Sequence, residues 1–154
     1  MSVKMTSNLK EEAKRTARIS RTIEGNLNYL VRDTTEELYR SLTQDPKGSA
    51  GVSTGTPRDT RRATNGWNIA EGGTQDYTDR GEGQYNEPPD AKSEARAKVS
   101  KGATTASVSN GVPYISELEN GTSKQAPQGF VKRAVNRTVN WLIGYDALDR
   151  NYRG

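Results

Sequence analysis

A chain of 154 residues is long enough for one domain with a single modest core. Only 31% of its residues are hydrophobic, and adding the glycines still leaves it short of the roughly 45–50% of a typical globular domain, so part of the chain is disordered or is buried against partner chains. Without cysteine or histidine it has no disulfide, no thiolate metal site, no thiol nucleophile and no imidazole base, which argues against most enzymes.

The net charge of +4 is unevenly distributed along the chain. Residues 1–66 carry 12 Lys/Arg against 8 Asp/Glu, residues 67–97 carry 3 against 7, and residues 98–154 carry 8 against 4. An acidic middle between two basic ends indicates complementary contacts between subunits at least as well as it indicates nucleic acid. No apolar run approaches 18 residues and no signal-peptide pattern opens the chain, so we expect a soluble, intracellular protein without a membrane span.

Residues 8–43 are predicted to form one long helix, or two helices with a weak joint. Asn8 and Glu11 have capping-box spacing, and Gly25 marks a possible bend. We interpret the apolar stripe as core packing; the alternative is that the part before Ile19 reaches a neighbouring subunit. The stripe recurs at threes and fours through Ile19, Ile23, Leu27, Leu30 or Val31, Thr34, Leu38 and Leu42.

A loop over residues 44–57 leads into a polar turn and a short strand. Pro57, Asp59 and Thr60 have the chemistry of a turn, and Trp67 opens a strand over 67–70. Asp59 has no second carboxylate or base at a useful spacing, so we do not interpret it as catalytic or metal-binding. Three interpretations stay open for the cluster of Arg58, Arg61 and Arg62: it binds phosphate, it binds the carboxylates of a partner chain, or it is a solvated polar turn.

Residues 71–93 are predicted to be a flexible acidic insert, because they contain no aliphatic side chain before Ala91 and cannot offset their ordering entropy alone. The spacing of the acids does not fit a calcium loop, and we expect no cofactor. A short helix with little to bury is predicted over 90–101. Ordering of the insert against a basic neighbour would use Asp76, Tyr77, Asp79, Glu82 and Tyr85.

The C-terminal third is dense in positional signals. A strand over 103–109 is predicted to pair with the strand at Trp67, followed by a helical turn at Tyr114–Leu118 that stops at Gly121. The last helix is predicted to open at Pro127 and end at Gly144, with a tail over 145–154 whose Tyr145 and Tyr152 lie along another subunit. Its apolar stripe comprises Phe130, Ala134, Thr138 and Trp141.

Together these elements predict an α+β fold in a single domain over residues 1–144. A long N-terminal helix and a C-terminal helix pack on a small antiparallel β-sheet, and a long variable loop interrupts the sheet.

Two motifs occur in order along the chain. The first covers residues 56–67 and has Ala63 between its Asp59-Thr60 pair and Trp67, and the second covers residues 110–130 and begins with Asn110 and Val112. Together they resemble the tail-component family of tailed phages, the neck or tail-completion proteins that include the lambda-type minor tail protein Z. They cover about 33 residues directly, and the implied element order spans about residues 10–143. The family commonly has glycine where this chain has Arg61, so we expect the backbone there not to adopt a positive φ easily. The matching positions are Pro57, Asp59, Thr60, Trp67, Pro113, Tyr114, Leu118, Glu119, Gly121, Pro127, Gly129 and Phe130.

The resemblance implies a non-enzymatic virion protein, made in the host cytoplasm and built into the neck. It would form a homo-oligomeric ring, with hexameric symmetry matching the tail, between the head-closure or connector proteins and the tail terminator or tube proteins. Genomic DNA would pass through the lumen without its sequence being read. The alternative function is non-specific DNA binding, favoured by the sequence pI of about 9.4 but unsupported by any recognition signature.

Overall fold

The computed structural model describes residues 6–44, 55–56, 61–80, 87–121 and 128–145, with side chains from residue 9 onward. Within these ranges the fold belongs to the predicted α+β class. The elements are α1 (Thr6–Leu27), α2 (Leu30–Thr43), α3 (Arg62–Asn65), β1 (Trp67–Glu71), α4 (Ala91–Lys98), β2 (Ala106–Asn110), α5 (Ile115–Glu119) and α6 (Phe130–Ile143).

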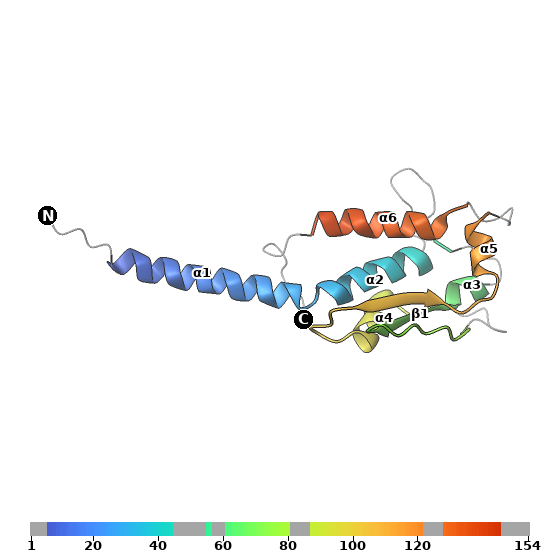
Figure 1. Cartoon of the computed structure of the whole chain (residues 1–154), viewed down its shortest axis with the longest axis horizontal. Helices are drawn as coiled ribbons and strands as arrows, with labels where there is room; N and C mark the ends of the chain where they lie inside the picture. The colour runs from blue at the N-terminus through green and yellow to red at the C-terminus, as the bar shows by residue number, and fades with distance from the viewer. Residues whose placement is uncertain (1–5, 45–54, 57–60, 81–86, 122–127, 146–154) are drawn as a thin grey trace.

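The predicted pairing of the two strands is confirmed. β1 and β2 are antiparallel, with Trp67 opposite Asn110 and Ile69 opposite Val108. β2 begins three residues later than predicted, at Ala106. Helices α2 and α4 contact the sheet, and α6 packs against α2, so α2 forms the central layer of the body (Figure 1).

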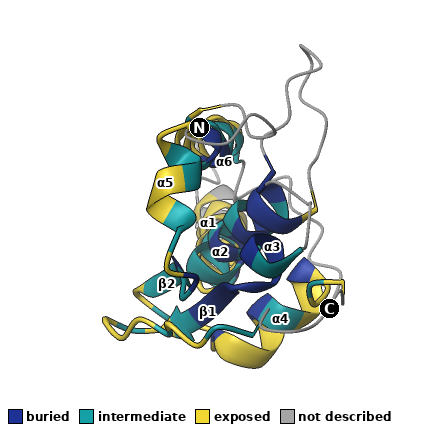
Figure 2. Ribbon diagram, turned by 90° about the vertical axis from the view of Figure 1, so that its right-hand side faces the viewer, coloured by how far each residue is buried: buried dark blue, intermediate teal, exposed yellow. Residues whose placement is uncertain are grey.

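The core gathers where α2, α4 and β1 meet the start of α6, and the buried residues in Figure 2 are concentrated there. Ala91 and Ala95 on α4 are fully buried, which corrects the prediction that this helix has little to bury. Small side chains let α4 approach α2 and β1 closely, so its burial does not depend on large apolar residues. The buried cluster comprises Tyr39, Leu42, Trp67, Ile69, Ala91, Ala95, Val99, Phe130 and Ala134.

The N-terminal helical region is two helices that separate at residues 28–29, and Gly25 lies inside α1. Because α1 begins at Thr6, the prediction that Asn8 caps it is wrong. The core interpretation of the stripe is right for Leu42, which is buried, but wrong for α1, where Ile19 is 40% and Leu27 48% exposed. Helix α1 instead projects away from the body (Figure 1), and its described side chains from 9 to 22 are all exposed.

Part of the acidic insert is ordered against its own chain. The Ser107 and Ser109 hydroxyls of β2 donate to the backbone carbonyls of Thr74 and Asp76, at 2.7 and 2.6 Å. The Asn68 side-chain amide donates to the Thr78 carbonyl at 2.7 Å. Residues 74–78 therefore run beside the sheet, where their carbonyls accept bonds from both strands.

The last helix also starts later than predicted. Helix α6 begins at Phe130 with Gly129 as its N-cap residue, so Pro127 precedes the first turn and lies outside the described residues. Its predicted stripe is confirmed in part: Phe130, Ala134 and Thr138 are buried. The neighbouring apolar side chains Val135, Val139, Leu142 and Ile143 are between 38% and 79% exposed.

Candidate functional site

The two sequence motifs meet at one end of the sheet. The Asn110 side chain donates to the Ala63 carbonyl at 2.8 Å and accepts from the Val112 backbone N–H at 2.9 Å, so one amide joins both motifs. The Gly111 N–H donates to the Gly66 carbonyl at 3.2 Å. A Cβ on Gly66 would lie 2.5 Å from a Val112 methyl carbon, so glycine is required by close packing there.

The second motif also connects α5 to α6 through Glu119. Its carboxylate accepts from the backbone N–H groups of Val131 and Lys132, at 2.8 and 3.1 Å. Its carbonyl accepts from the N–H of Gly129 at 2.8 Å. Two donors at a helix N-terminus are thereby satisfied by a negative charge, the sign that the helix dipole favours. Glu119 is therefore the residue that caps α6.

Two glycines of this motif have the left-handed backbone that their positions require. Gly121 has φ +82° and Gly129 has φ +79°. The predicted left-handed stop at Gly121 is confirmed, and its N–H donates to the Leu118 carbonyl at 3.1 Å. Gly121 follows the end of α5, and Gly129 immediately precedes α6.

The first motif is tied to the end of α2 through Thr56. The indole N–H of Trp67 donates to the Thr56 hydroxyl at 2.7 Å, and that hydroxyl donates to the Leu42 carbonyl at 2.8 Å. The Thr56 N–H donates to the same carbonyl at 2.9 Å. Trp67 is 5% exposed, so its one polar atom is satisfied inside the core.

Two predicted subunit-contact residues, Arg62 and Asp79, contact each other within the chain. The Arg62 guanidinium donates two hydrogen bonds to Asp79 Oδ2, at 3.0 and 2.7 Å, and lies 5.9 Å from the centre of the Tyr114 ring. One arginine thus joins the insert to both motifs. The expected ordering of the insert against basic residues is met here by a basic residue of the same chain.

Arg61 departs from the sequence-based expectation. Its φ is 59°, in the left-handed region that we expected a non-glycine residue to avoid. The side chain forms an ion pair with Glu87. Such a conformation costs a non-glycine residue roughly 1–2 kcal/mol. Arg61 is the N-cap residue of α3, and its carbonyl accepts a hydrogen bond from the Asn65 N–H at 2.8 Å.

Arg80 is a residue that sequence reasoning missed. Its guanidinium donates to the Trp67 carbonyl at 2.6 Å and to Glu94 at 3.1 Å, joining the insert to β1 and α4. Burial raises the pKa of the nearby Tyr39 hydroxyl to about 12, and the positive charge of Arg80 offsets part of that rise. Arg80 was identifiable as the single basic residue between positions 71 and 91.

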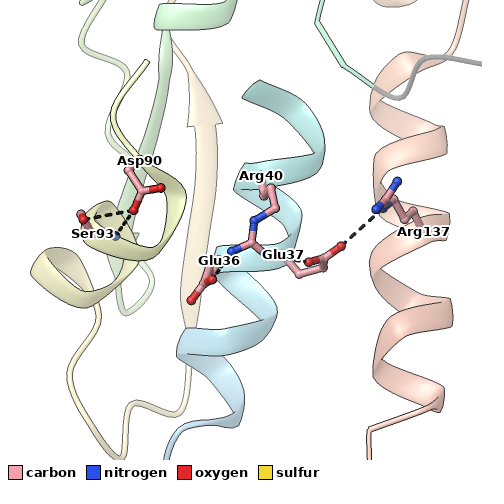
Figure 3. A network of polar contacts seen from close by, with 6 residues as sticks. All are labelled: Glu36, Glu37, Arg40, Asp90, Ser93 and Arg137. Atoms are coloured by element: carbon pink, nitrogen blue, oxygen red, sulfur yellow. Dashed lines mark hydrogen bonds and ion pairs between the residues drawn. The ribbon is translucent and has the colours of Figure 1, made fainter. Parts of the chain in front are cut away.

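Ion pairs connect α2 to α6, and a separate pair of hydrogen bonds lies at the start of α4 (Figure 3). On α2, Arg40 pairs with Glu36 and Glu37, and Arg137 of α6 reaches Glu37 at 3.4 Å.

At the start of α4, Asp90 is the N-cap residue. It accepts bonds from the Ser93 backbone N–H at 3.0 Å and from the Ser93 hydroxyl at 3.1 Å. These bonds to the charged form hold the pKa of the Asp90 carboxyl below its usual value.

The junction between α1 and α2 is held by the body. The Gly102 N–H donates to the Asn28 carbonyl at 2.6 Å, and the Tyr145 hydroxyl donates to the Asn26 carbonyl at 3.2 Å. The Tyr29 ring lies 4.6 Å from the Arg32 guanidinium carbon and 5.2 Å from the Lys101 ammonium nitrogen. Tyr145, predicted to lie along another subunit, therefore contacts its own chain.

The remaining predicted residues are placed as follows. Pro113 and Tyr77 are exposed, Tyr77 to 61%. Asp76 accepts from the Thr78 N–H at 2.9 Å, and hydrogen bonds from Thr78 lower the pKa of its carboxyl. Leu118 packs against the core as a partly buried residue. Outside the described residues lie Pro57, Arg58, Asp59, Thr60, Glu82, Tyr85, Pro127 and Tyr152.

Across the described ranges, no cluster of three or more acidic side chains is placed to hold a metal ion. The motif junction consists of capping groups, packed glycines and ion pairs that join segments. The chemical role of these groups is to fix the relative positions of α3, β1, β2, α5 and α6. None of the helices in the described part of the chain is long and apolar enough to cross a membrane.

Comparison with protein-family models, with curated proteins and with solved structures found no match for this chain. Membership of the tail-component family thus rests on the two motifs and stays a prediction.

Proposed function

We propose that this protein is a structural subunit of a homo-oligomeric ring at the head–tail junction of a tailed bacteriophage. The ring completes the tail and joins it to the connector, as the motif resemblance implies. The observation that carries the proposal is the exposed α1: a helix of 22 residues that projects from the body with Leu9 66% and Leu27 48% exposed. A helix gains most of its stability by packing an apolar face, so a subunit with this shape is completed by its neighbours.

Two further observations support assembly over catalysis. Helix α6 exposes a row of apolar side chains, and contiguous exposed apolar surface usually marks a contact with another molecule. Three side chains of the motifs bond to backbone groups or to another motif residue, as parts that set geometry do. Glu119, Asn110 and Trp67 all do so.

Native mass measurement of the purified full-length chain tests the proposal, followed by localisation of the protein on phage particles by electron microscopy. We expect a closed ring mass, hexameric if it matches the tail, and labelling confined to the neck. A protein that stays monomeric both alone and with purified connector and tail-tube proteins, or labelling elsewhere on the particle, contradicts the proposal.

Non-specific DNA binding is the second candidate, and one observation favours it. Lys14, Arg18 and Arg21 lie around one side of α1 and are exposed. If this surface holds DNA as a function of its own, the affinity falls steeply with salt, with a slope that decreases by about one for each phosphate contact removed. Arg18→Gln and Arg21→Gln should each lower that slope, whereas a ring protein that only surrounds DNA shows weak binding at physiological salt.

A further inference from the structure

Helix α1 has an amphipathic pattern that its own body leaves uncovered from residue 9 to residue 22, and Ile23 near its end is half-buried. Positions three and four apart form one stripe of apolar and small residues, and the basic residues Lys14, Arg18 and Arg21 lie on other sides. Leu9 is 66% and Leu27 48% exposed. The stripe comprises Leu9, Ala13, Thr16, Ser20, Ile23 and Leu27.

The body has an apolar groove at the end from which α1 leaves it. The groove is open to solvent and has a volume of about 440 Å³. Its apolar lining comes from Leu30, Val31 and Leu38 of α2, Ala106 and Val108 of β2 and Leu142 of α6, and threonines of α2 and of the segment before β2 complete it. Leu142, at its edge, is 38% exposed and continues into the exposed apolar row of α6. The groove and the stripe are therefore two complementary surfaces on one chain.

A chain cannot place its own α1 in its own groove in this structure. The bonds at Asn26 and Asn28 from Tyr145 and Gly102 hold the junction so that α1 points away from the body (Figure 1). Helix α1 is about 33 Å long at 1.5 Å per residue, which is about the diameter of a small domain. It is therefore long enough to cross the body of an adjacent molecule.

We propose that the apolar stripe of α1 docks in the groove between α2, β2 and α6 of a second copy of this chain. Each subunit then supplies one helix and one groove, which is a head-to-tail contact that repeats around a ring. The inference rests on the self-assembly in the proposed function and names the surfaces that perform it.

The test is a pair of matched variants on the full-length chain, with mass followed as a function of concentration by sedimentation velocity. Thr16→Glu places a carboxylate on the stripe, and Thr22→Glu places the same charge on the side of α1 that carries Arg18 and Arg21. We expect Thr16→Glu to weaken association by at least about a hundredfold, because an unpaired charge would be buried in an apolar groove. Thr22→Glu should associate like the wild type.

The groove is tested from the other side with Leu142→Glu and its control Asn140→Glu. Both add one charge to α6, but Asn140 is exposed and lies on another side of the helix from the groove. Leu142→Glu should weaken association about as much as Thr16→Glu, and Asn140→Glu should not. Circular dichroism at a concentration where all variants are monomeric checks that each body remains folded.

Direct contact is tested by cross-linking, which the absence of cysteine in the natural chain makes simple. A chain with Leu9→Cys is mixed with a chain with Thr105→Cys, whose side chain lies at the exposed rim of the groove. Repeating the mixture with Ala13→Cys and Ile23→Cys covers the registers that the stripe allows. At least one should form mixed disulfides faster than the control Arg18→Cys.

The outcomes separate the inference from the proposed function. A ring that survives both Thr16→Glu and Leu142→Glu overturns the inference and leaves the ring. A dimer that both variants dissociate supports the docking and contradicts the ring. Monomers at every concentration contradict both. Equal rates of mixed-disulfide formation for stripe and control positions also overturn docking between copies.

Discussion

Replacing Glu119 by alanine removes the group that caps α6. The carboxylate accepts two backbone N–H groups, at 2.8 and 3.1 Å, and lies near the positive end of the helix dipole. A side-chain cap contributes about 0.5–2 kcal/mol, and a charge at a helix N-terminus adds about 0.3–1 kcal/mol. Glu119 is only partly buried, which places the expected loss near the middle of the combined range, at about 1.5–2 kcal/mol.

Glu119→Gln is the matched control, because an amide oxygen of similar position still accepts one N–H but carries no charge. It should lose about half as much stability as Glu119→Ala. Urea unfolding followed by far-UV circular dichroism measures both differences. One low protein concentration is used throughout, so that self-association does not contribute to stability.

Two results would refute this reasoning about the cap. One is an alanine variant as stable as the wild type, which would mean that water replaces the carboxylate without cost. The other is a glutamine variant as unstable as alanine, which would mean that the negative charge alone, and not the accepted hydrogen bonds, stabilises the start of α6.

Three further predictions follow from individual residues. Arg61→Gly and Arg61→Ala both remove the ion pair with Glu87, but only glycine relieves the strain of the positive φ. In urea unfolding the glycine variant should therefore be more stable than the alanine variant by about 0.5–1 kcal/mol, and equal stability of the two variants would exclude strain at this position. Because burial raises the pKa of Tyr39 to about 12 from about 10, the folded state keeps a proton that the unfolded state loses, and stability falls as pH rises between those values. The free energy of unfolding should be measured between pH 9 and 11.5 for the wild type and for Tyr39→Phe. Above pH 10 the wild type should lose up to about 1.4 kcal/mol per pH unit relative to the variant, and an identical pH dependence of the two proteins would contradict this. Gly111→Ala places a Cβ 1.9 Å from the Tyr77 carbonyl oxygen, a clash that no rotamer relieves, so this variant should lose about 2–3 kcal/mol of stability in thermal or urea unfolding. The control Gly73→Ala, whose Cβ meets nothing within 4 Å, should lose well under half of that. Similar losses in the two variants would argue against the packing of the insert on β2.

Local signals in the sequence predicted the elements except α3, whose residues were assigned to a polar turn, and they placed the starts of β2 and α6 three residues early. Alternation at Trp67 predicts β1, the small polar run ending at Asn110 predicts its partner, and Gly121 predicts the left-handed stop. These features depend on the backbone preferences of neighbouring residues and on the periodicity of their apolar side chains, and both can be read directly from the sequence. The α+β class followed from their order.

Long-range contacts decided what those signals left open. The same periodic apolar stripe is core in α2 but exposed in α1, because the body binds the backbone at Asn28 and so ends the packed stretch there. Arg61 adopts the left-handed region despite its side chain, because the surrounding junction outweighs a local preference of about 1–2 kcal/mol.

The acidic insert and the cap of α6 also show which features local sequence predicts and which depend on long-range contacts. Composition indicates that residues 71–93 cannot fold alone. In the folded chain, however, Arg62 bonds to Asp79 of this segment, and Arg80 of the segment bonds to the Trp67 carbonyl, so part of the segment is held in place. The sequence placed Glu119 in a motif, and only the tertiary structure gave it the α6 backbone as a partner. Sequence by itself thus determined most of the segments that form helix, strand and turn, because those depend mainly on neighbours in the chain, but it did not predict α3. Tertiary structure decided which faces are covered, because burial depends on residues distant in sequence.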